Sequence, residues 1–137
     1  MPSLLTWVRW RDVPVLARSG EFLYIHAMVE SVKTRPDLAG IRELAKEIAA
    51  MFTPKRIVLF GSLARGTAGA ESDADLLVLV EGDEPPLRLA ARINASIDHP
   101  FPIDILVWRT SRFDESLRRG GSFATEVARS GVVLYEA

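Results

Sequence analysis

The hydrophobic and polar positions of the chain predict helices that alternate with short buried strands. From Asp37, whose side chain suits an N-cap after Pro36, apolar residues recur at helical spacing up to Phe52. The run RIVLF over residues 56–60 then predicts a strand that ends at Gly61. The positions expected on the apolar face of the first helix are Leu38, Ile41, Leu44, Ala45, Ile48 and Phe52.

The alternation continues through the second half of the chain. Residues 75–80 predict a second apolar strand, and the polar stretch EGDE over residues 81–84 predicts the turn that closes it. A helix with Pro86 in its first turn follows, with an expected apolar face of Leu87, Ala90, Ala91, Asn94 and Ile97. Three more elements, a strand, a helix and a strand, are predicted over FPIDILVW, SFATEVARS and VVLYE (residues 101–108, 122–130 and 132–136). This order predicts an α/β fold, with helices packed on a small mixed sheet.

Composition narrows the function classes. At 137 residues the chain is most simply one domain, and with 48% hydrophobic and 26% charged residues it has the composition of a globular protein. A net charge of −1 predicts no broad surface for nucleic acid or membranes, so an anion site would have to be local. The absence of cysteine excludes disulfides, a thiol nucleophile and a cysteine-ligated zinc site. No apolar run is long enough to span a bilayer, and residues 1–12 lack the features of a signal peptide, so we expect a cytoplasmic protein.

Two carboxylates stand where the second strand begins. Side chains two positions apart on a strand point to the same face, with Cα atoms about 6.5–7 Å apart, so Asp73 and Asp75 are predicted to aim at one point. A hard divalent cation would relieve their repulsion, and Mg²⁺ prefers carboxylates, water and substrate phosphates as ligands. Upstream, Gly61 allows the backbone to approach a phosphate closely. Ser62 then begins a short predicted helix (residues 62–66) whose N–H groups and hydroxyl suit the same anion.

A third carboxylate, Asp104, lies inside the apolar strand predicted over residues 101–108. A charge at such a position is costly unless it is paired or bound to a metal. If this strand neighbours the strand over residues 75–80, Asp104 faces the same point as Asp73 and Asp75. Two metal ions about 3.5–4 Å apart, bridged by carboxylates, are a recurring arrangement for phosphoryl and nucleotidyl transfer.

These motifs together resemble those of a known superfamily. The signature of the DNA polymerase beta-type nucleotidyltransferases is similar to three parts of this chain, namely Gly61-Ser62-x-Ala64-Arg65-Gly66, Ser72-Asp73-x-Asp75-Leu76 and the strand residue Asp104. Within that superfamily the chain most resembles the minimal nucleotidyltransferases (MNT type). The resemblance covers residues 37–137, which we expect to form a polymerase beta-like nucleotidyltransferase domain, and it leaves residues 1–36 as an N-terminal extension without an assigned role.

The resemblance implies roles for the three carboxylates. Asp73 and Asp75 would bind two Mg²⁺ ions, and Asp104 would bind the catalytic ion and help to deprotonate an acceptor hydroxyl. The reaction would be attack of that hydroxyl on the α-phosphate of a nucleoside triphosphate, with release of pyrophosphate. Without the resemblance, Asp73 and Asp75 could be loop carboxylates that cap a neighbouring segment, and Asp104 could be a solvent-facing charge on an edge strand.

The resemblance also implies a binding site for the phosphates. Ser62 and the backbone after Gly61 would hold the β- and γ-phosphates, whereas Arg65 would either reach a phosphate or only brace the turn. The plainer alternative is a strand-to-helix turn in which Ser62 is an N-cap. The chain contains no GxxxxGK[ST] motif, so a P-loop nucleotide site is not supported.

The function that the resemblance implies is Mg²⁺-dependent transfer of AMP from ATP to a hydroxyl of a protein partner. After Asp104 the chain has too few residues for a domain that binds an acceptor, and MNT proteins are commonly paired, as antitoxins, with a small helical HEPN toxin. Two alternatives stay open, an antitoxin that acts by contact alone and an aminoglycoside-type transferase of small molecules. Homo- or hetero-oligomers are compatible with each of them, and neither direct nucleic-acid binding nor membrane association is expected.

Overall fold

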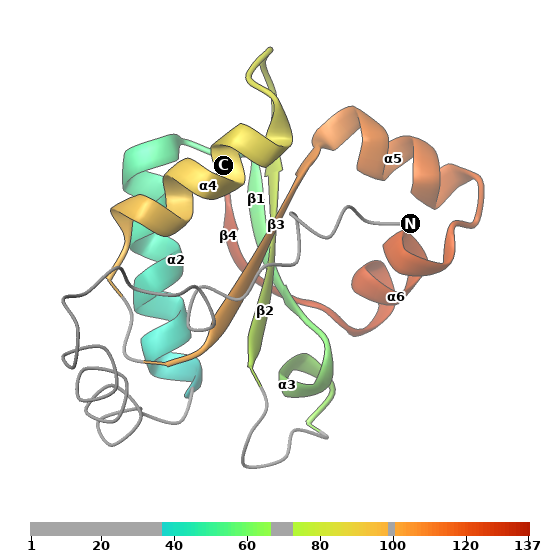
Figure 1. Cartoon of the computed structure of the whole chain (residues 1–137). Helices are drawn as coiled ribbons and strands as arrows, with labels where there is room; N and C mark the ends of the chain where they lie inside the picture. The colour runs from blue at the N-terminus through green and yellow to red at the C-terminus, as the bar shows by residue number, and fades with distance from the viewer. Residues whose placement is uncertain (1–36, 67–72, 99–100) are drawn as a thin grey trace, which may run out of the picture.

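The sheet at the centre of the molecule has four strands. The computed structural model describes residues 37–66, 73–98 and 101–137. The strands are β1 (Arg56–Phe60), β2 (Ala74–Val80), β3 (Ile103–Arg109) and β4 (Val132–Glu136), and their order in the sheet is β3-β2-β1-β4 (Figure 1). β1 runs antiparallel to β2 and β4, whereas β2 and β3 are parallel. The predicted small mixed sheet is therefore confirmed.

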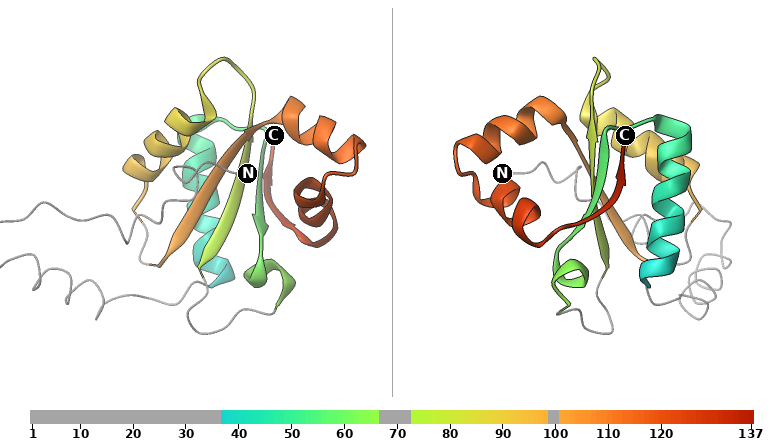
Figure 2. Two further views of the ribbon diagram at one scale, coloured as in Figure 1. Left: turned by 45° about the vertical axis from the view of Figure 1, so that its right-hand side comes forward. Right: turned by 180° about the vertical axis from the view of Figure 1, so that it is seen from behind.

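Helices cover both faces of this sheet. The described helices are α2 (Leu38–Phe52), α3 (Ser62–Arg65), α4 (Pro86–Ser96), α5 (Thr110–Arg118) and α6 (Ser122–Ser130). Two of them, α2 and α4, pack on one face, and α5 and α6 pack on the other (Figures 1 and 2). The short helix α3 lies at the end of the sheet where β1 ends and β2 begins (Figure 1). None of the described helices is long and apolar enough to cross a membrane.

Two buried clusters explain why the strands are almost continuously apolar. Alternate residues of a strand face opposite sides. In β1, Ile57 and Leu59 join the core under α2 and α4, while Val58 and Phe60 join the core under α5 and α6. Strands that are covered on both faces have no solvent side on which polar residues would be favoured. A carboxylate within such a strand therefore needs a specific reason to be there.

The first described helix confirms its predicted start. The Asp37 side chain accepts a hydrogen bond from the Gly40 N–H at 2.8 Å, as expected of an N-cap. Its buried face consists of Ile41, Leu44, Ala45, Ile48 and Ala49. The prediction was wrong for Leu38, which is 48% exposed, because contact between α2 and the core begins one turn later at Ile41.

The apolar face predicted for α4 needs a correction. Its buried residues are Leu89, Ala90 and Ile93, with Ile97 buried at the C-cap, whereas Leu87 and Ala91 are exposed. Asn94 is half-buried, and its amide donates to the Ala90 carbonyl at 2.9 Å. Alanine can lie on either the buried or the exposed face of a helix. The sequence was therefore compatible with an apolar face that is rotated about the helix axis from the face that packs on the sheet.

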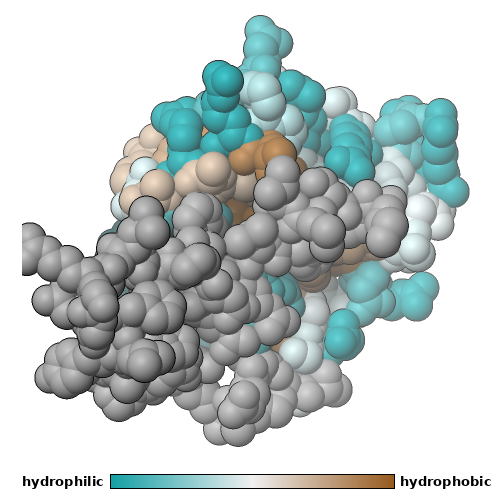
Figure 3. Space-filling view, in the orientation of Figure 1, coloured by the Kyte–Doolittle hydropathy of each residue, from teal (hydrophilic) through white to brown (hydrophobic). Residues whose placement is uncertain are grey.

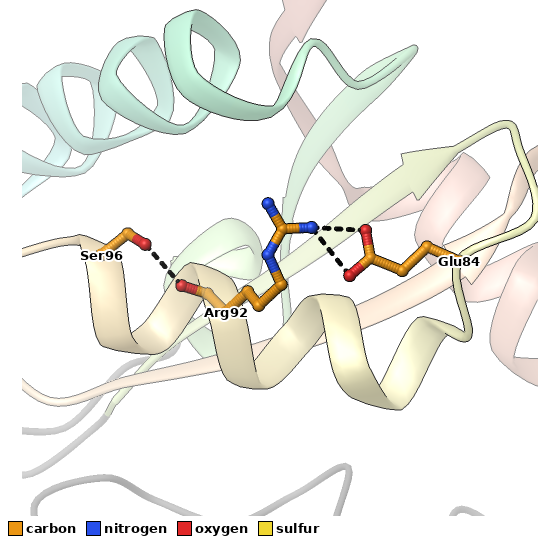
Figure 4. Close-up of polar contacts among 3 residues, drawn as sticks. All are labelled: Glu84, Arg92 and Ser96. Atoms are coloured by element: carbon orange, nitrogen blue, oxygen red, sulfur yellow. Dashed lines mark hydrogen bonds and ion pairs between the residues drawn. The ribbon is translucent and has the colours of Figure 1, made fainter.

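Polar contacts hold the outer side of α4 in place. The Arg92 guanidinium donates to both carboxylate oxygens of Glu84, which lies in the turn before the helix (Figure 4). The same guanidinium lies 5.5 Å from the centre of the Phe52 ring, so it also contacts the end of α2. Ser96 donates to the Arg92 carbonyl at 2.7 Å (Figure 4). These contacts confirm that EGDE is a polar turn.

The sequence pattern missed α5. Arg118 is the last residue of this helix and Arg119 is its C-cap, and both contact Glu115. Only Phe113 of α5 is buried, so the segment TSRFDESLR carries no apolar stripe from which a helix could be predicted. Hydrophilic residues gather over α5 and over the turn between β2 and α4 (Figure 3). Ser72, and the extension predicted over residues 1–36, lie outside the described residues.

Candidate active site

The glycine turn after β1 has a conformation that only glycine adopts readily. Gly61 has φ 81° and ψ −158°, a backbone region that is essentially restricted to glycine. A Cβ at this position would overlap Oδ2 of Asp75. The missing side chain therefore lets the backbone of the turn lie directly against the Asp75 carboxylate.

Two of the predicted site residues meet on neighbouring strands. Asp75 of β2 and Asp104 of β3 are register partners, and in the other direction Asp75 is the partner of Phe60. Paired positions in a sheet share a face and lie about 4.8 Å apart. Because Phe60 joins the core under α5 and α6, both carboxylates lie on that face of the sheet. The predicted adjacency of the two strands is confirmed, and Asp104 is only 6% exposed although β3 is an edge strand.

Asp73 lies just before β2 and is also buried, with 7% of its surface exposed. The residue after it, Ala74, donates its N–H to the Pro102 carbonyl at 3.0 Å, which ties the beginning of β2 to the beginning of β3. In the three described ranges, no group of three or more His, Asp or Glu side chains is arranged to hold a metal ion. The structure thus pairs Asp75 with Asp104, and the convergence of all three carboxylates stays a prediction.

Ser62 is the first residue of α3 and not its N-cap. Gly61 occupies the N-cap position and has no side chain that could cap the helix, so the alternative in which Ser62 is the N-cap is wrong. Leu63 and Ala64 pack partly against the core, and the Gly66 N–H donates to the Ser62 carbonyl. The turn therefore presents Ser62, half-buried, next to the glycine that contacts Asp75.

Arg65 makes an ion pair that the sequence pattern did not predict. Its Nη1 lies 3.2 Å from Oε1 of Glu126 in α6, and the two side chains are 43% and 46% exposed. The contact joins α3 to a helix 61 residues away in the chain. No local pattern could have identified Glu126, because its partner is set by the packing of α6 on the sheet. In this structure Arg65 braces the turn.

An aromatic cluster fixes α6 beside the carboxylates. Phe123 of α6 meets the Phe60 ring edge-on, with 5.2 Å between ring centres, and lies 5.0 Å from Trp108. The Arg112 guanidinium stacks over the Trp108 ring, 3.9 Å from its centre. Since Phe60 is the strand partner of Asp75, these contacts hold α6 close to the candidate site.

The arrangement suits chemistry on phosphate groups. It combines a backbone turn without a side chain, a neighbouring hydroxyl and two acidic side chains on adjacent strands. Carboxylate oxygens are hard donors, and Mg²⁺ is usually bound by one or two of them together with water and substrate phosphates. The Asp75–Asp104 pair fits that donor set. Fold and site together define an enzyme that acts on phosphate groups, by phosphoryl or nucleotidyl transfer.

Comparison with known families specifies the class. The family described as "Nucleotidyltransferase domain" matches residues 41–119, which is more than half of the chain. The chain belongs to this family, and the protein is a nucleotidyltransferase. The matched range includes all six predicted site residues, from Gly61 to Asp104.

Individual relatives agree with this assignment. A Methanocaldococcus jannaschii protein named "Putative protein adenylyltransferase MJ0141" is 42% identical over 70 residues, which cover 49% of this chain and 70% of the relative. A crystal structure described as a "putative nucleotidyltransferase from Sulfolobus solfataricus" superposes with a TM-score of 0.53 at 20% identity, over 72% of this chain and 79% of that one. The second likeness supports the polymerase beta-like fold alone.

Proposed function

We propose that this nucleotidyltransferase moves AMP from ATP to a hydroxyl group of a protein partner, with Mg²⁺ as its cofactor. The observation that carries the proposal is the register pairing of Asp75 with Asp104, together with the contact between Asp75 and the Gly61 turn. A phosphate-binding backbone and a cation-binding pair would then lie side by side. This is what transfer at the α-phosphate of a nucleotide requires.

The carboxylates would hold the metal. Asp75 and Asp104 fit one Mg²⁺ ion, and Asp73, buried just before the same strand, is proposed as a further ligand that completes the site for two ions when ATP is bound. Bound Mg²⁺ would neutralise charge on the phosphates and polarise the α-phosphate. Its loss would leave acidic side chains facing a polyanion, so the proposal requires that a chelator abolish transfer.

The turn would hold the triphosphate. The Gly61–Ser62 backbone and the Ser62 hydroxyl are proposed to donate to the β- and γ-phosphates. Arg65, three residues after Ser62 in α3, is proposed to contribute its positive charge. Asp104 would accept the proton of the acceptor hydroxyl while the hydroxyl oxygen attacks the α-phosphorus. A new phosphorus–oxygen bond would form, the bond to the β-phosphate oxygen would break, and pyrophosphate would leave.

The second part of the proposal is that the acceptor of AMP is a protein. Two observations support it. One is the name of the Methanocaldococcus relative, "Putative protein adenylyltransferase MJ0141". The other is the resemblance of the motifs to those of MNT proteins, which are commonly paired with HEPN toxins. The acceptor is proposed to be a hydroxyl, such as that of a tyrosine, on a HEPN-type partner that the added AMP would inactivate. The reaction is proposed to take place in the cytoplasm. An ordinary phenol is protonated at neutral pH, with a pKa of about 10, so it would need the assistance of Asp104.

Mass spectrometry tests this function directly. Incubating the protein and a HEPN-type partner with ATP and Mg²⁺ should add one or more AMP masses to the partner. Asp75→Asn and Asp104→Asn should each lower the rate by at least about 10²-fold, the scale of removing one strong electrostatic stabiliser, while the melting temperature stays close to that of the wild type. Asp73→Asn should have a comparable effect if all three carboxylates act together.

Two outcomes would contradict the proposal in different ways. If the partner is silenced without modification, and an Asp73/Asp75 double variant silences it equally well, the protein is an antitoxin that acts by contact. If AMP appears on an aminoglycoside and never on the partner, the acceptor is a small molecule. Transfer that persists in both the Asp75→Asn and Asp104→Asn variants would remove the metal-assisted mechanism altogether.

A further inference from the structure

The ion pair between Arg65 and Glu126 joins two parts of the molecule that are held very differently. α3 has four residues, none of them fully buried, and in the described part of the chain it meets the core through the partly buried Leu63 and Ala64. α6, in contrast, buries Ala124 and Val127 completely or nearly so. The carboxylate therefore sits on a fixed helix, and the guanidinium sits at the end of a short, lightly anchored one.

The position of Glu126 brings a negative charge close to the proposed triphosphate site. It follows Phe123 by about one helical turn, and Phe123 packs on Phe60, the strand partner of Asp75. Arg65 is the last residue of the helix that begins with Ser62, so its guanidinium could also bind the phosphates held at that helix. While Arg65 is paired with Glu126, its positive charge is not available to them. A bound triphosphate would also meet the field of the unpaired Glu126.

The strength of this ion pair allows it to be exchanged. Both side chains are close to half exposed, and ion pairs of this kind contribute little because water and salt screen them. Guanidinium contacts with phosphate oxygens are charge-assisted and often bidentate. A triphosphate also carries more negative charge than one carboxylate, so it can displace Glu126 from the Arg65 guanidinium.

We propose that Glu126 competes with the triphosphate of ATP for Arg65 and thereby sets the affinity of the enzyme for its nucleotide. Without nucleotide, Arg65 is paired with Glu126, and nucleotide binding transfers Arg65 to the phosphates. Glu126 is thus a positioning residue that acts through Arg65. This inference rests on the proposed function, since it takes the triphosphate to lie at the Gly61–Ser62 turn.

Calorimetric titration with ATP and Mg²⁺, without acceptor, tests the competition. Glu126→Gln keeps an oxygen that can accept from Arg65 but removes the charge, so the Kd for ATP should fall by about two- to fivefold at low salt, and the gain should shrink at high salt. Arg65→Ala should weaken binding. In the Arg65→Ala background, Glu126→Gln should yield a smaller gain than in the wild type.

A matched control separates this effect from a general change in charge. Glu136 pairs with Arg56 at 3.0 Å, at the end of β1 remote from Gly61, and Glu136→Gln should leave the Kd unchanged. If Glu126→Gln binds ATP no more tightly than the wild type, or gains as much in the Arg65→Ala background, the competition is overturned while nucleotide binding stands. If the wild type itself binds no ATP, the proposed function falls and this inference falls with it.

Discussion

At the scale of single residues, the site depends on what is absent as much as on what is present. Gly61 combines a backbone conformation that side chains disfavour with a contact that a side chain would block, and the contact is with Asp75, a candidate metal ligand. A second glycine, Gly66, ends α3 at φ 75°, and no atom of the described residues lies within 4 Å of where its Cβ would be. Both glycines have a positive φ, which would strain any other residue, but only Gly61 makes a contact that a Cβ would block, so the two positions form a natural comparison.

Gly61→Ala should impair both folding and transfer. The strained backbone is expected to lower the free energy of unfolding by about 1–3 kcal/mol. The added methyl group should also displace the Asp75 carboxylate and reduce transfer. Gly66→Ala should cost about 1–2 kcal/mol of stability and retain most of the transfer activity. Urea unfolding and an AMP-transfer assay on both variants would check this, and full activity in Gly61→Ala would show that the contact with Asp75 has no functional role.

At the scale of elements, α6 packs on the face of the sheet opposite to α2 and α4, and its contacts stabilise the candidate site. Its aromatic residue contacts the cluster next to the carboxylates, its Glu126 holds α3, and its end leads into β4 through Gly131. Gly131 has an ordinary φ of −70°, so its identity is not a matter of backbone strain. Its Cβ would instead lie 2.6 Å from Cγ1 of Val58 and overlap the Val127 carbonyl.

Gly131→Ala should therefore act through packing alone. Overfilling this contact should lower the free energy of unfolding by about 1–3 kcal/mol, which for a domain of this size means a fall in melting temperature of at least several degrees. Gly121, at the other end of α6, is the control, because there the added methyl group would meet mainly the side-chain oxygen of Ser116, which can rotate away. If Gly121→Ala proves as destabilising as Gly131→Ala in thermal melts, the tight packing against Val58 is not the cause.

At the scale of the whole molecule, the buried core is built by residues between Ile41 and Val127 in the described part of the chain. The residues that cover both faces of the sheet come from that range, and the candidate site lies at one end of the sheet. A protein that begins at Met28 would retain every one of these contacts.

We accordingly expect a variant that begins at Met28 to fold and to transfer AMP. Its melting temperature should stay within a few degrees of that of the full chain, since no residue of the two buried clusters has been removed. Circular dichroism melts of the two proteins, together with the transfer assay, provide the comparison. A large fall in melting temperature would show instead that residues before Met28, such as Trp7 or Leu16, contribute to the core.

The sequence by itself determined the features that depend on neighbouring residues. The N-cap at Asp37, the strands, the Gly61 turn and the three acidic residues could all be identified, because caps, strand alternation and glycine turns are local properties of the chain. The motif around Gly61 and Asp75 also indicated the nucleotidyltransferase class that the family comparison confirms.

Only the tertiary structure decided which distant residues meet. The pairing of Asp75 with Asp104 follows from the parallel register of β2 and β3, and the Arg65–Glu126 contact follows from where α6 packs. Neither the rotation of α4 nor the presence of α5 could be predicted, since alanines fit either side of a helix and a helix with one buried residue has no stripe. In each case the deciding free energy comes from contacts between segments far apart in the chain, which no local pattern records.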